Sequence, residues 1–271
     1  MTTNEFYFTS ANGIQRVFAK EWLPPEEPVA ILLISHGMAE YIERYAEFAA
    51  FLAEYGILVA GLDHCGHGKS VRTPDDLGFF AEEDGWNLLV ENLHLLRTKE
   101  EDAHPGLPVF LLGHSMGSFL ARTYMMNHGD GLAGVILCGT GVVPEAAIRA
   151  GQAIAAMERK KYGSHHRSSR LNQLSFGSFN KKFAPNRTQN DWLSRDDAVV
   201  DAYSSDPYCG FVFTVAAFQD LFTGLSYIQN RRNLAKILPG LPVFLLSGSE
   251  DPVGNNGRGV QKVAHALLDA G

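Results

Sequence analysis

The chain has 271 residues, of which 45% are hydrophobic and 20% charged, and its formal net charge is -7. This length suits one large core, and the composition is that of a globular domain rather than a disordered or fibrous chain. The negative charge and the lack of clustered Lys and Arg exclude nucleic acid as an expected partner.

A β-hairpin is predicted at the start of the chain, because the turn signal Ala11-Asn12-Gly13 separates Phe6-Tyr7-Phe8 from residues 14–22. Five continuous apolar runs follow, which are typical of strands buried on both faces. These runs cover residues 29–35, 57–62, 109–112, 135–138 and 243–246, and helical spacing occurs at 45–52, 86–96 and 118–127. The alternation predicts an α/β fold with a mostly parallel central sheet flanked by helices.

The alternation breaks between residues 142 and 223, which are rich in Ser, Asn, Gln and basic residues and show no clear buried strand. This stretch also holds aromatic side chains that need burial, and they disfavour a disordered linker. They are Phe176, Phe179, Phe183, Trp192, Phe211 and Phe213. We expect a mostly helical cap, inserted after the sixth strand, over the C-terminal edge of the sheet. The core would then comprise residues 1–141 and 224–271.

A G-x-S-x-G motif, Gly113-His114-Ser115-Met116-Gly117, follows a buried strand and opens a helix. In that context a tight turn exposes the serine hydroxyl at a helix start, where backbone N–H groups can hold an oxyanion. Glycine on both sides of the turn lets backbone segments approach closely. A chance match in a loop is the alternative, which the strand–turn–helix context disfavours. Ser115 is therefore the predicted nucleophile of a serine hydrolase.

Three motifs occur in order: Ser35-His36-Gly37-Met38-Ala39-Glu40 followed by Arg44-Tyr45, then Asp63-His64-Cys65-Gly66-His67-Gly68-Lys69-Ser70, then the Ser115 turn. Together they resemble the monoacylglycerol lipase and lysophospholipase group of α/β-hydrolases, which is also classified under the serine aminopeptidase heading. The resemblance runs from about residue 29 to the C-terminus, and residues 206–211 are similar to bacterial members. It implies the α/β-hydrolase fold, and we expect no cofactor.

The resemblance also implies roles for three further residues. The backbone N–H groups of Met38 and Met116 would form the oxyanion hole, each donor being worth roughly 3 kcal/mol in the transition state. Asp251, just past the run 243–246, lies where the acid of the catalytic triad is expected. The adjacent Glu250 is the weaker candidate, with a solvated loop charge as its expected role.

The loop at residues 63–68 contains Asp, His and Cys, all of which can bind metals. No matching second half occurs elsewhere in the sequence, so a zinc site is not expected. We expect a structural loop that shapes the floor of the site, with His64 and His67 as hydrogen-bonding residues. His114 is expected to pack under the turn, away from the position of a base.

The catalytic base is the missing member of the triad. The resemblance places a histidine on a loop after one further strand, whereas only His265 follows Asp251, in a segment with helical spacing. We expect the sequence to be part of a longer protein, lacking the last strand and helix and so exposing apolar sheet. The alternatives are a base recruited from the cap, His165 or His166, and a hydrolase-like scaffold without turnover.

The aromatic-rich cap favours an apolar acyl group, so we expect a small-molecule monoester such as a monoacylglycerol or lysophospholipid. Phe79 and Phe211 are the candidates for lining its site, and core packing is the alternative for Phe79. Transient contact of the cap with a lipid or membrane surface is also expected. The second candidate is an aminopeptidase that holds a substrate amine through Asp196-Asp197 and Asp201, and the third a non-catalytic binding protein. Ser115 excludes the epoxide hydrolases and dehalogenases of this fold, which place Asp at the turn.

Cysteine usage and the N-terminus bear on the compartment. Cys65, Cys138 and Cys209 are odd in number and irregularly spaced, which favours a reducing environment over a disulfide framework. The first residues lack the basic start and apolar run of a signal peptide, and the apolar runs are too short to cross a bilayer. We therefore expect a cytoplasmic protein.

Overall fold

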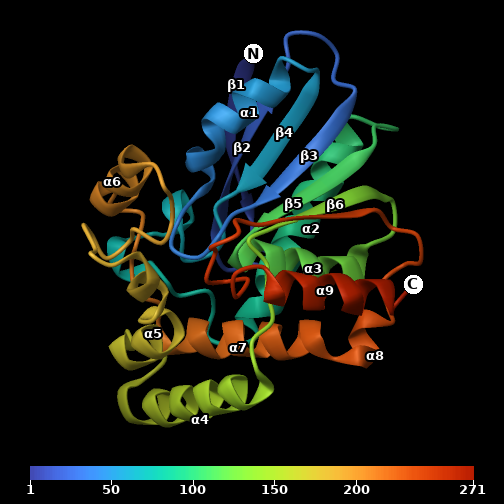
Figure 1. The fold of residues 1–271 in the computed structure, drawn as a ribbon. Helices are drawn as coiled ribbons and strands as arrows, with labels where there is room; N and C mark the ends of the chain where they lie inside the picture. The colour runs from blue at the N-terminus through green and yellow to red at the C-terminus, as the bar shows by residue number, and fades with distance from the viewer.

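The computed structural model describes residues 1–271, and at its centre lies a seven-stranded sheet in the order β1-β2-β4-β3-β5-β6-β7 (Figure 1). Strands β3 to β7 run parallel, whereas β1 and β2 form an antiparallel hairpin that joins the sheet through β4. The predicted hairpin and all five predicted strands are confirmed, but the last of them, at residues 243–246, is not buried on both faces. The bounds are β1 (Thr2–Thr9), β2 (Arg16–Leu23), β3 (Ala30–Ser35), β4 (Ile57–Leu62), β5 (Val109–His114), β6 (Leu132–Cys138) and β7 (Val243–Leu246).

Strand β3 shows why these runs are apolar without interruption. Successive side chains of a strand point to opposite faces. Ile31 and Leu33 accordingly join the larger core on one face, while Leu32 and Ile34 join the smaller core on the other. Because helices cover both faces of this part of the sheet, every residue of the strand meets an apolar neighbour.

The helices divide between the two faces (Figure 1). The smaller core contains Ala49 of α1 (Ala46–Ala53), and the larger core contains residues of α2 (Gly85–Ala103), α3 (Met116–His128), α7 (Val215–Gln229) and α9 (Arg258–Leu268). Helix α8 (Arg231–Leu234) follows α7, and the 3-10 turns are η1 (Ile42–Tyr45), η2 (Gly68–Ser70), η3 (Pro74–Asp76) and η4 (Phe179–Phe183). None of the helices is both long and apolar enough to cross a membrane.

Helix α2 extends well beyond the predicted residues 86–96. Apolar periodicity ends there, but the Arg97 side chain bonds Glu101 at 2.8 Å and the carbonyl oxygens of His128 and Asp130 at 2.9 and 2.7 Å. A pattern of apolar residues does not reveal these polar contacts, which stabilise the helix as far as Ala103.

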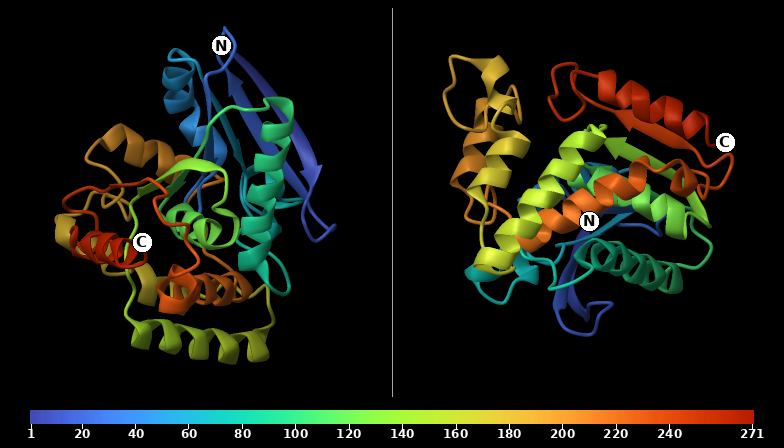
Figure 2. Two further views of the ribbon diagram at one scale, coloured as in Figure 1. Left: turned by 90° about the vertical axis from the view of Figure 1, so that its right-hand side faces the viewer. Right: turned by 90° about the horizontal axis from the view of Figure 1, so that it is seen from below.

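Residues 142–223 contain α4 (Glu145–Tyr162), α5 (Ser169–Phe176), η4 and α6 (Asp197–Ser205), followed by the start of α7. Helix α4 packs along α7 rather than on the sheet, and α5 and α6 lie to one side (Figures 1 and 2). Tyr41, shortly after β3, donates to Asp206 at 2.8 Å, so the segment lies at the carboxyl ends of the strands. Helix α7 continues from this segment into the core, so the expected boundary of the cap at residue 223 falls inside the helix.

One face of strands β5 to β7 is apolar and largely uncovered. Phe244 is 60% exposed and Leu246 51% exposed. A shallow groove of about 280 Å³ runs across this face, lined by Phe110, Gly134, Val135, Ile136, Pro242, Val243 and Phe244. Strand β7 also has only one neighbour in the sheet, so the expected exposure of apolar sheet is present.

The buried carboxyl group of Glu100 gives the stability of the fold a pH dependence. Glu100 on α2 is 1% exposed; burial, followed by the neighbouring carboxylate of Glu21 on β2, raises its pKa to about 8. The folded state therefore binds a proton that the unfolded state has already released. Stability must fall as the pH rises from near the unfolded pKa of Glu to about 8.

We therefore expect Glu100→Gln to be more stable than the parent by roughly 1–3 kcal/mol at pH 9, with the difference vanishing at pH 5. Urea denaturation at both pH values measures this. Asp102→Asn, which changes an exposed carboxylate on the same helix, is the matched control. An equal stability gain for Glu100→Gln at pH 5 and pH 9 would contradict the titration argument.

Candidate active site

The topology puts the candidate residues at one place in the sheet. The chain leaves β3 on one side to form β4 and returns on the other side to form β5. In open α/β sheets, ligands bind beside the carboxyl ends of strands at such a reversal. The loop after β3 carries Met38, and the turn after β5 carries Ser115.

Ser115 stands between β5 and α3 with φ 52° and ψ -118°, in a region that residues with a Cβ rarely adopt. Such a conformation costs about 1–3 kcal/mol and persists only where its surroundings enforce it. Here Ser115 N–H donates to Cys138 O at 2.9 Å, and Ser115 O accepts the Ser118 hydroxyl at 2.6 Å. The side chain stays half-buried and therefore accessible. This is the geometry that a nucleophile turn requires.

Gly113 and Gly117 are required because the main chain of neighbouring segments packs directly against them. A Cβ on Gly117 would overlap with the Ser35 carbonyl oxygen and lie 2.6 Å from His36 O. A Cβ on Gly113 would lie 2.8 Å from Ser118 Cα. Strand β3, strand β5 and helix α3 therefore pack too tightly here for any side chain.

We expect Gly117→Ala to destabilise the protein by about 4 kcal/mol or more, because the clash is with main chain that cannot rotate away. Urea denaturation and soluble yield measure the loss. Gly248→Ala is the matched control, since its added Cβ would meet only Asp251, at 3.8 Å. An unchanged unfolding midpoint for Gly117→Ala would show that the turn is looser than described.

The two predicted oxyanion donors have no acceptor in the protein. Met38 N–H takes part in none of the loop hydrogen bonds. Met116 is the first residue of α3, so its N–H group has no acceptor within the helix. The Met38 loop also touches the turn, because a Cβ on Gly37 would lie 3.3 Å from Ser115 Cβ. The N-terminus of α3 adds a favourable dipole for a developing negative charge.

A cluster of buried, neutral histidines supports the Met38 loop. His36 Nε2 accepts His64 N–H at 3.0 Å, so its Nδ1 carries the proton and donates to Gly37 O at 2.8 Å. His67 Nε2 accepts Ala39 N–H at 3.3 Å. Burial, followed by its histidine neighbours, lowers the pKa of His36 well below its usual value, and burial lowers that of His67 to about 4. The predicted structural role of residues 63–68 thus includes positioning the loop after β3.

Asp251 lies on the loop after β7, at the same edge of the sheet as Ser115. Its Oδ1 accepts Val253 N–H at 2.8 Å, and its Oδ2 accepts the Ser247 hydroxyl at 3.2 Å. A Cβ on Gly139 would lie 3.4 Å from Asp251 Oδ2, which places the carboxylate beside the end of β6. Glu250 instead points outward and pairs with Arg195 at 3.2 Å, as expected of a loop charge.

None of the hydrogen bonds in the structure joins a histidine to the Ser115 hydroxyl. His165 stacks on Phe79 with ring centroids 3.9 Å apart, His166 stacks on Tyr162, and His265 is exposed on α9. Burial opposes protonation of His114, but hydrogen bonding to Cys138 and the nearby carboxylates raise its pKa to about 9. None of the hydrogen bonds joins the His114 ring to the Ser115 hydroxyl, so the structure does not bring this histidine to the position of a base.

The two predicted lining residues differ in their surroundings. Phe211 packs on His67 at 5.2 Å between ring centroids and so lies close to the Met38 loop. Phe79 is turned to His165, on the loop between α4 and α5. Of the two side chains, only that of Phe211 therefore packs on a residue that supports the candidate oxyanion hole.

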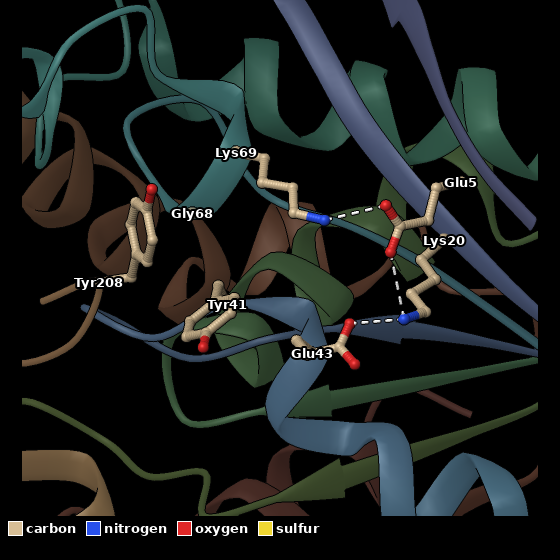
Figure 3. A pocket seen from close by; sticks show the side chains of 7 residues that line it. All are labelled: Glu5, Lys20, Tyr41, Glu43, Gly68, Lys69 and Tyr208. Atoms are coloured by element: carbon tan, nitrogen blue, oxygen red, sulfur yellow. Dashed lines mark hydrogen bonds and ion pairs between the residues drawn. The ribbon is translucent and has the colours of Figure 1, made fainter. Parts of the chain in front are cut away.

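A separate cavity of about 370 Å³ opens beside Tyr41 and Tyr208 (Figure 3). Its charged side chains pair with one another: Lys20 with Glu43 at 2.7 Å and Glu5 at 3.3 Å, and Lys69 with Glu5 at 2.9 Å. None of the predicted catalytic residues lines this cavity.

In the whole structure, no group of three or more His, Cys, Asp or Glu side chains is arranged to hold a metal ion.

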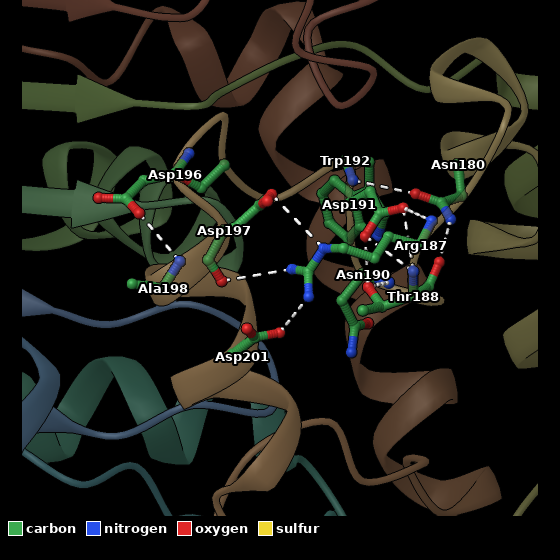
Figure 4. A network of polar contacts seen from close by, with 11 residues as sticks. Asn180, Arg187, Thr188, Asn190, Asp191, Trp192, Asp196, Asp197, Ala198 and Asp201 are labelled. Carbon is green, nitrogen blue, oxygen red and sulfur yellow. Dashed lines mark hydrogen bonds and ion pairs between the residues drawn. The ribbon is translucent and has the colours of Figure 1, made fainter.

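The carboxylates that could hold a substrate amine are already engaged (Figure 4). Arg187 pairs with Asp197 at 3.5 Å and with Asp201 at 2.5 Å. Asp196 caps α6 by accepting Ala198 N–H at 2.9 Å. These side chains form a polar network of their own rather than an open acidic site.

Comparison with known proteins agrees with this geometry. Residues 26–269 match the family model described as "Serine aminopeptidase, S33". The chain is 30% identical to the monoglyceride lipase of Homo sapiens, over 90% of this chain and 72% of that one. It is 27% identical to the monoacylglycerol lipase of Mycolicibacterium smegmatis, over 97% and 85%.

Among solved structures, the chain is similar to a highly thermostable carboxyl esterase from Bacillus coagulans in complex with glycerol. The TM-score is 0.92 at 29% identity, covering 100% of this chain and 87% of that one. A structure described as "Lipase (Open form)" gives a TM-score of 0.89 at 26% identity, over 100% and 87%.

Proposed function

Because this chain belongs to the serine aminopeptidase S33 family and has the α/β-hydrolase fold, we propose that it cleaves monoesters of apolar acyl chains through an acyl-enzyme on Ser115. The substrate class is that of monoacylglycerols or lysophospholipids. The observation that carries the proposal is the left-handed turn at Ser115 beside the free N–H groups of Met38 and Met116. The similarity to monoglyceride lipases and to a carboxyl esterase supports it.

The chemistry follows from the arrangement of these groups. Ser115 Oγ attacks the ester carbonyl and gives its proton to a general base, while Met38 and Met116 N–H hold the resulting oxyanion. Collapse of the tetrahedral intermediate releases the alcohol, which takes the proton from the base, and water then hydrolyses the acyl-enzyme. In this proposal a histidine is the general base and Asp251 orients its ring; none of the hydrogen bonds within residues 1–271 joins a histidine to the Ser115 hydroxyl or to the Asp251 carboxylate.

The apolar surroundings support a hydrocarbon chain as the acyl group. Phe211 and Phe213 stack at 6.1 Å, and both rings pack on His67. The aminopeptidase alternative has no comparable support, because Asp197 and Asp201 both pair with Arg187 and Asp196 caps α6.

Two panels of substrates test the proposal. A p-nitrophenyl ester series of increasing chain length, followed by monoacylglycerols and lysophospholipids, is expected to give the highest kcat/KM for the medium or long chains. Aminoacyl-anilides are expected to be cleaved poorly. Dominant anilide cleavage would reverse the ranking, and a folded protein that hydrolyses neither class would refute the proposed activity.

We also propose that the protein acts in the cytoplasm and that residues 142–223 meet a lipid surface transiently. In support, Leu174 is 65% exposed on α5 and Met157 56% exposed on α4, and basic residues close α4. Co-sedimentation with anionic vesicles, compared for the parent and Leu174→Ser, tests the lipid contact.

A further inference from the structure

Four consecutive peptide groups around Met38 are each held by a hydrogen bond, and the first three partners lie close by in the core. Gly37 N–H donates to Glu40 Oε1 at 2.6 Å. Gly37 O accepts His36 Nδ1–H, and Ala39 N–H donates to His67 Nε2. The second of these peptide groups carries Met38 N–H, so the direction of this oxyanion donor is fixed from both sides.

The fourth peptide group is held by a distant part of the chain. Ala39 O accepts the Tyr203 hydroxyl at 3.0 Å and Gly210 N–H at 3.0 Å. Both donors belong to residues 203–210, which we call the α6 turn because it begins at the end of α6. Ala39 has φ 53°, a left-handed conformation that an L-residue keeps only when its neighbours enforce it.

Tyr203 also reaches the other end of the loop. The Arg44 guanidinium lies over its ring, 5.0 Å from the centroid, and Arg44 Nε pairs with Glu40 Oε2 at 3.2 Å. Glu40 is the residue that holds Gly37 N–H. Tyr203 therefore contacts Ala39 O directly and is linked to Gly37 N–H through Arg44 and Glu40.

We infer that Tyr203 is a positioning residue for the oxyanion hole: its hydroxyl holds Ala39 O and thereby aims Met38 N–H at the developing oxyanion. The rate of acyl transfer then depends on where the α6 turn sits, not only on the residues of the core. This inference rests on the proposed function, since an oxyanion hole matters only if Ser115 attacks an ester.

Tyr203→Phe tests the inference because it removes one hydroxyl and keeps the ring over Arg44. We expect kcat for a short p-nitrophenyl ester to fall roughly tenfold, with KM within twofold of the parent. The affinity of a trifluoromethyl ketone, which forms an oxyanion adduct with Ser115, should weaken by the same factor as kcat/KM. Tyr208→Phe, in the same turn, is the matched control, because none of the side-chain hydrogen bonds involves its hydroxyl.

A kcat within twofold of the parent, or a loss confined to KM, would overturn the inference. A lower melting temperature with unchanged kcat and unchanged ketone affinity would do the same, since it would show a purely structural role. Amide hydrogen exchange provides a readout that needs no turnover: peptides covering residues 37–41 should exchange faster in Tyr203→Phe than in Tyr208→Phe. If the parent protein hydrolyses no ester, the proposed function fails, while this exchange measurement still decides whether the α6 turn holds the loop.

Discussion

Ser115→Ala is expected to lower kcat for ester hydrolysis by about 10⁴-fold or more, to the level set by binding and the oxyanion donors alone. The reason is that no acyl-enzyme can form without the hydroxyl. Fold and stability should be retained, because the substitution leaves the backbone bonds to Cys138 and Ser118 in place and adds no volume.

The measurement pairs kcat with labelling by a fluorophosphonate probe, followed by intact mass. The parent should gain one adduct and Ser115→Ala none. Ser205→Ala, an exposed serine on α6, is the control and should label like the parent. Labelling of Ser115→Ala at the parent rate would assign the nucleophile to another residue.

Asp251→Asn is expected to lower kcat by roughly 10⁴-fold while leaving KM and stability nearly unchanged. The amide can still accept Val253 N–H through its oxygen, so the loop after β7 keeps its shape. An amide group cannot hold an imidazole in the tautomer that accepts the serine proton, nor can it stabilise the imidazolium that forms.

Steady-state kinetics with one ester, over a range of pH values, decides this case. Glu250→Gln, the neighbouring exposed carboxylate, should stay within twofold of the parent, because Glu250 faces Arg195 and Lys182. A larger loss in Glu250→Gln than in Asp251→Asn would exchange the roles of the two carboxylates.

The parts of the site that could be predicted are those formed by residues that are close together in the sequence. The Ser115 turn is local: strand, glycine, serine, glycine and helix follow one another. Met38 and Asp251 follow predicted strands, and resemblance to known hydrolases suggested their roles.

What could not be predicted depends on contacts between distant positions. Tyr203 and Ala39 are separated by 164 residues, and nothing in either local sequence indicates that they meet. Glu40 lies within a recognised motif, yet its role as the acceptor for Gly37 N–H needed the folded loop. Helix α7 crosses the expected boundary at residue 223 for the same reason, since its apolar face serves the core and the inserted segment together.

The bonds between the α6 turn and Ala39 have a consequence for exchanging parts between related enzymes. Grafting a foreign stretch in place of residues 142–223 to change acyl-chain preference would also remove Tyr203 and Gly210. A chimera that keeps residues 203–210 retains the contacts to Ala39 O, whereas one that replaces them removes these contacts and leaves the loop around Met38 less constrained.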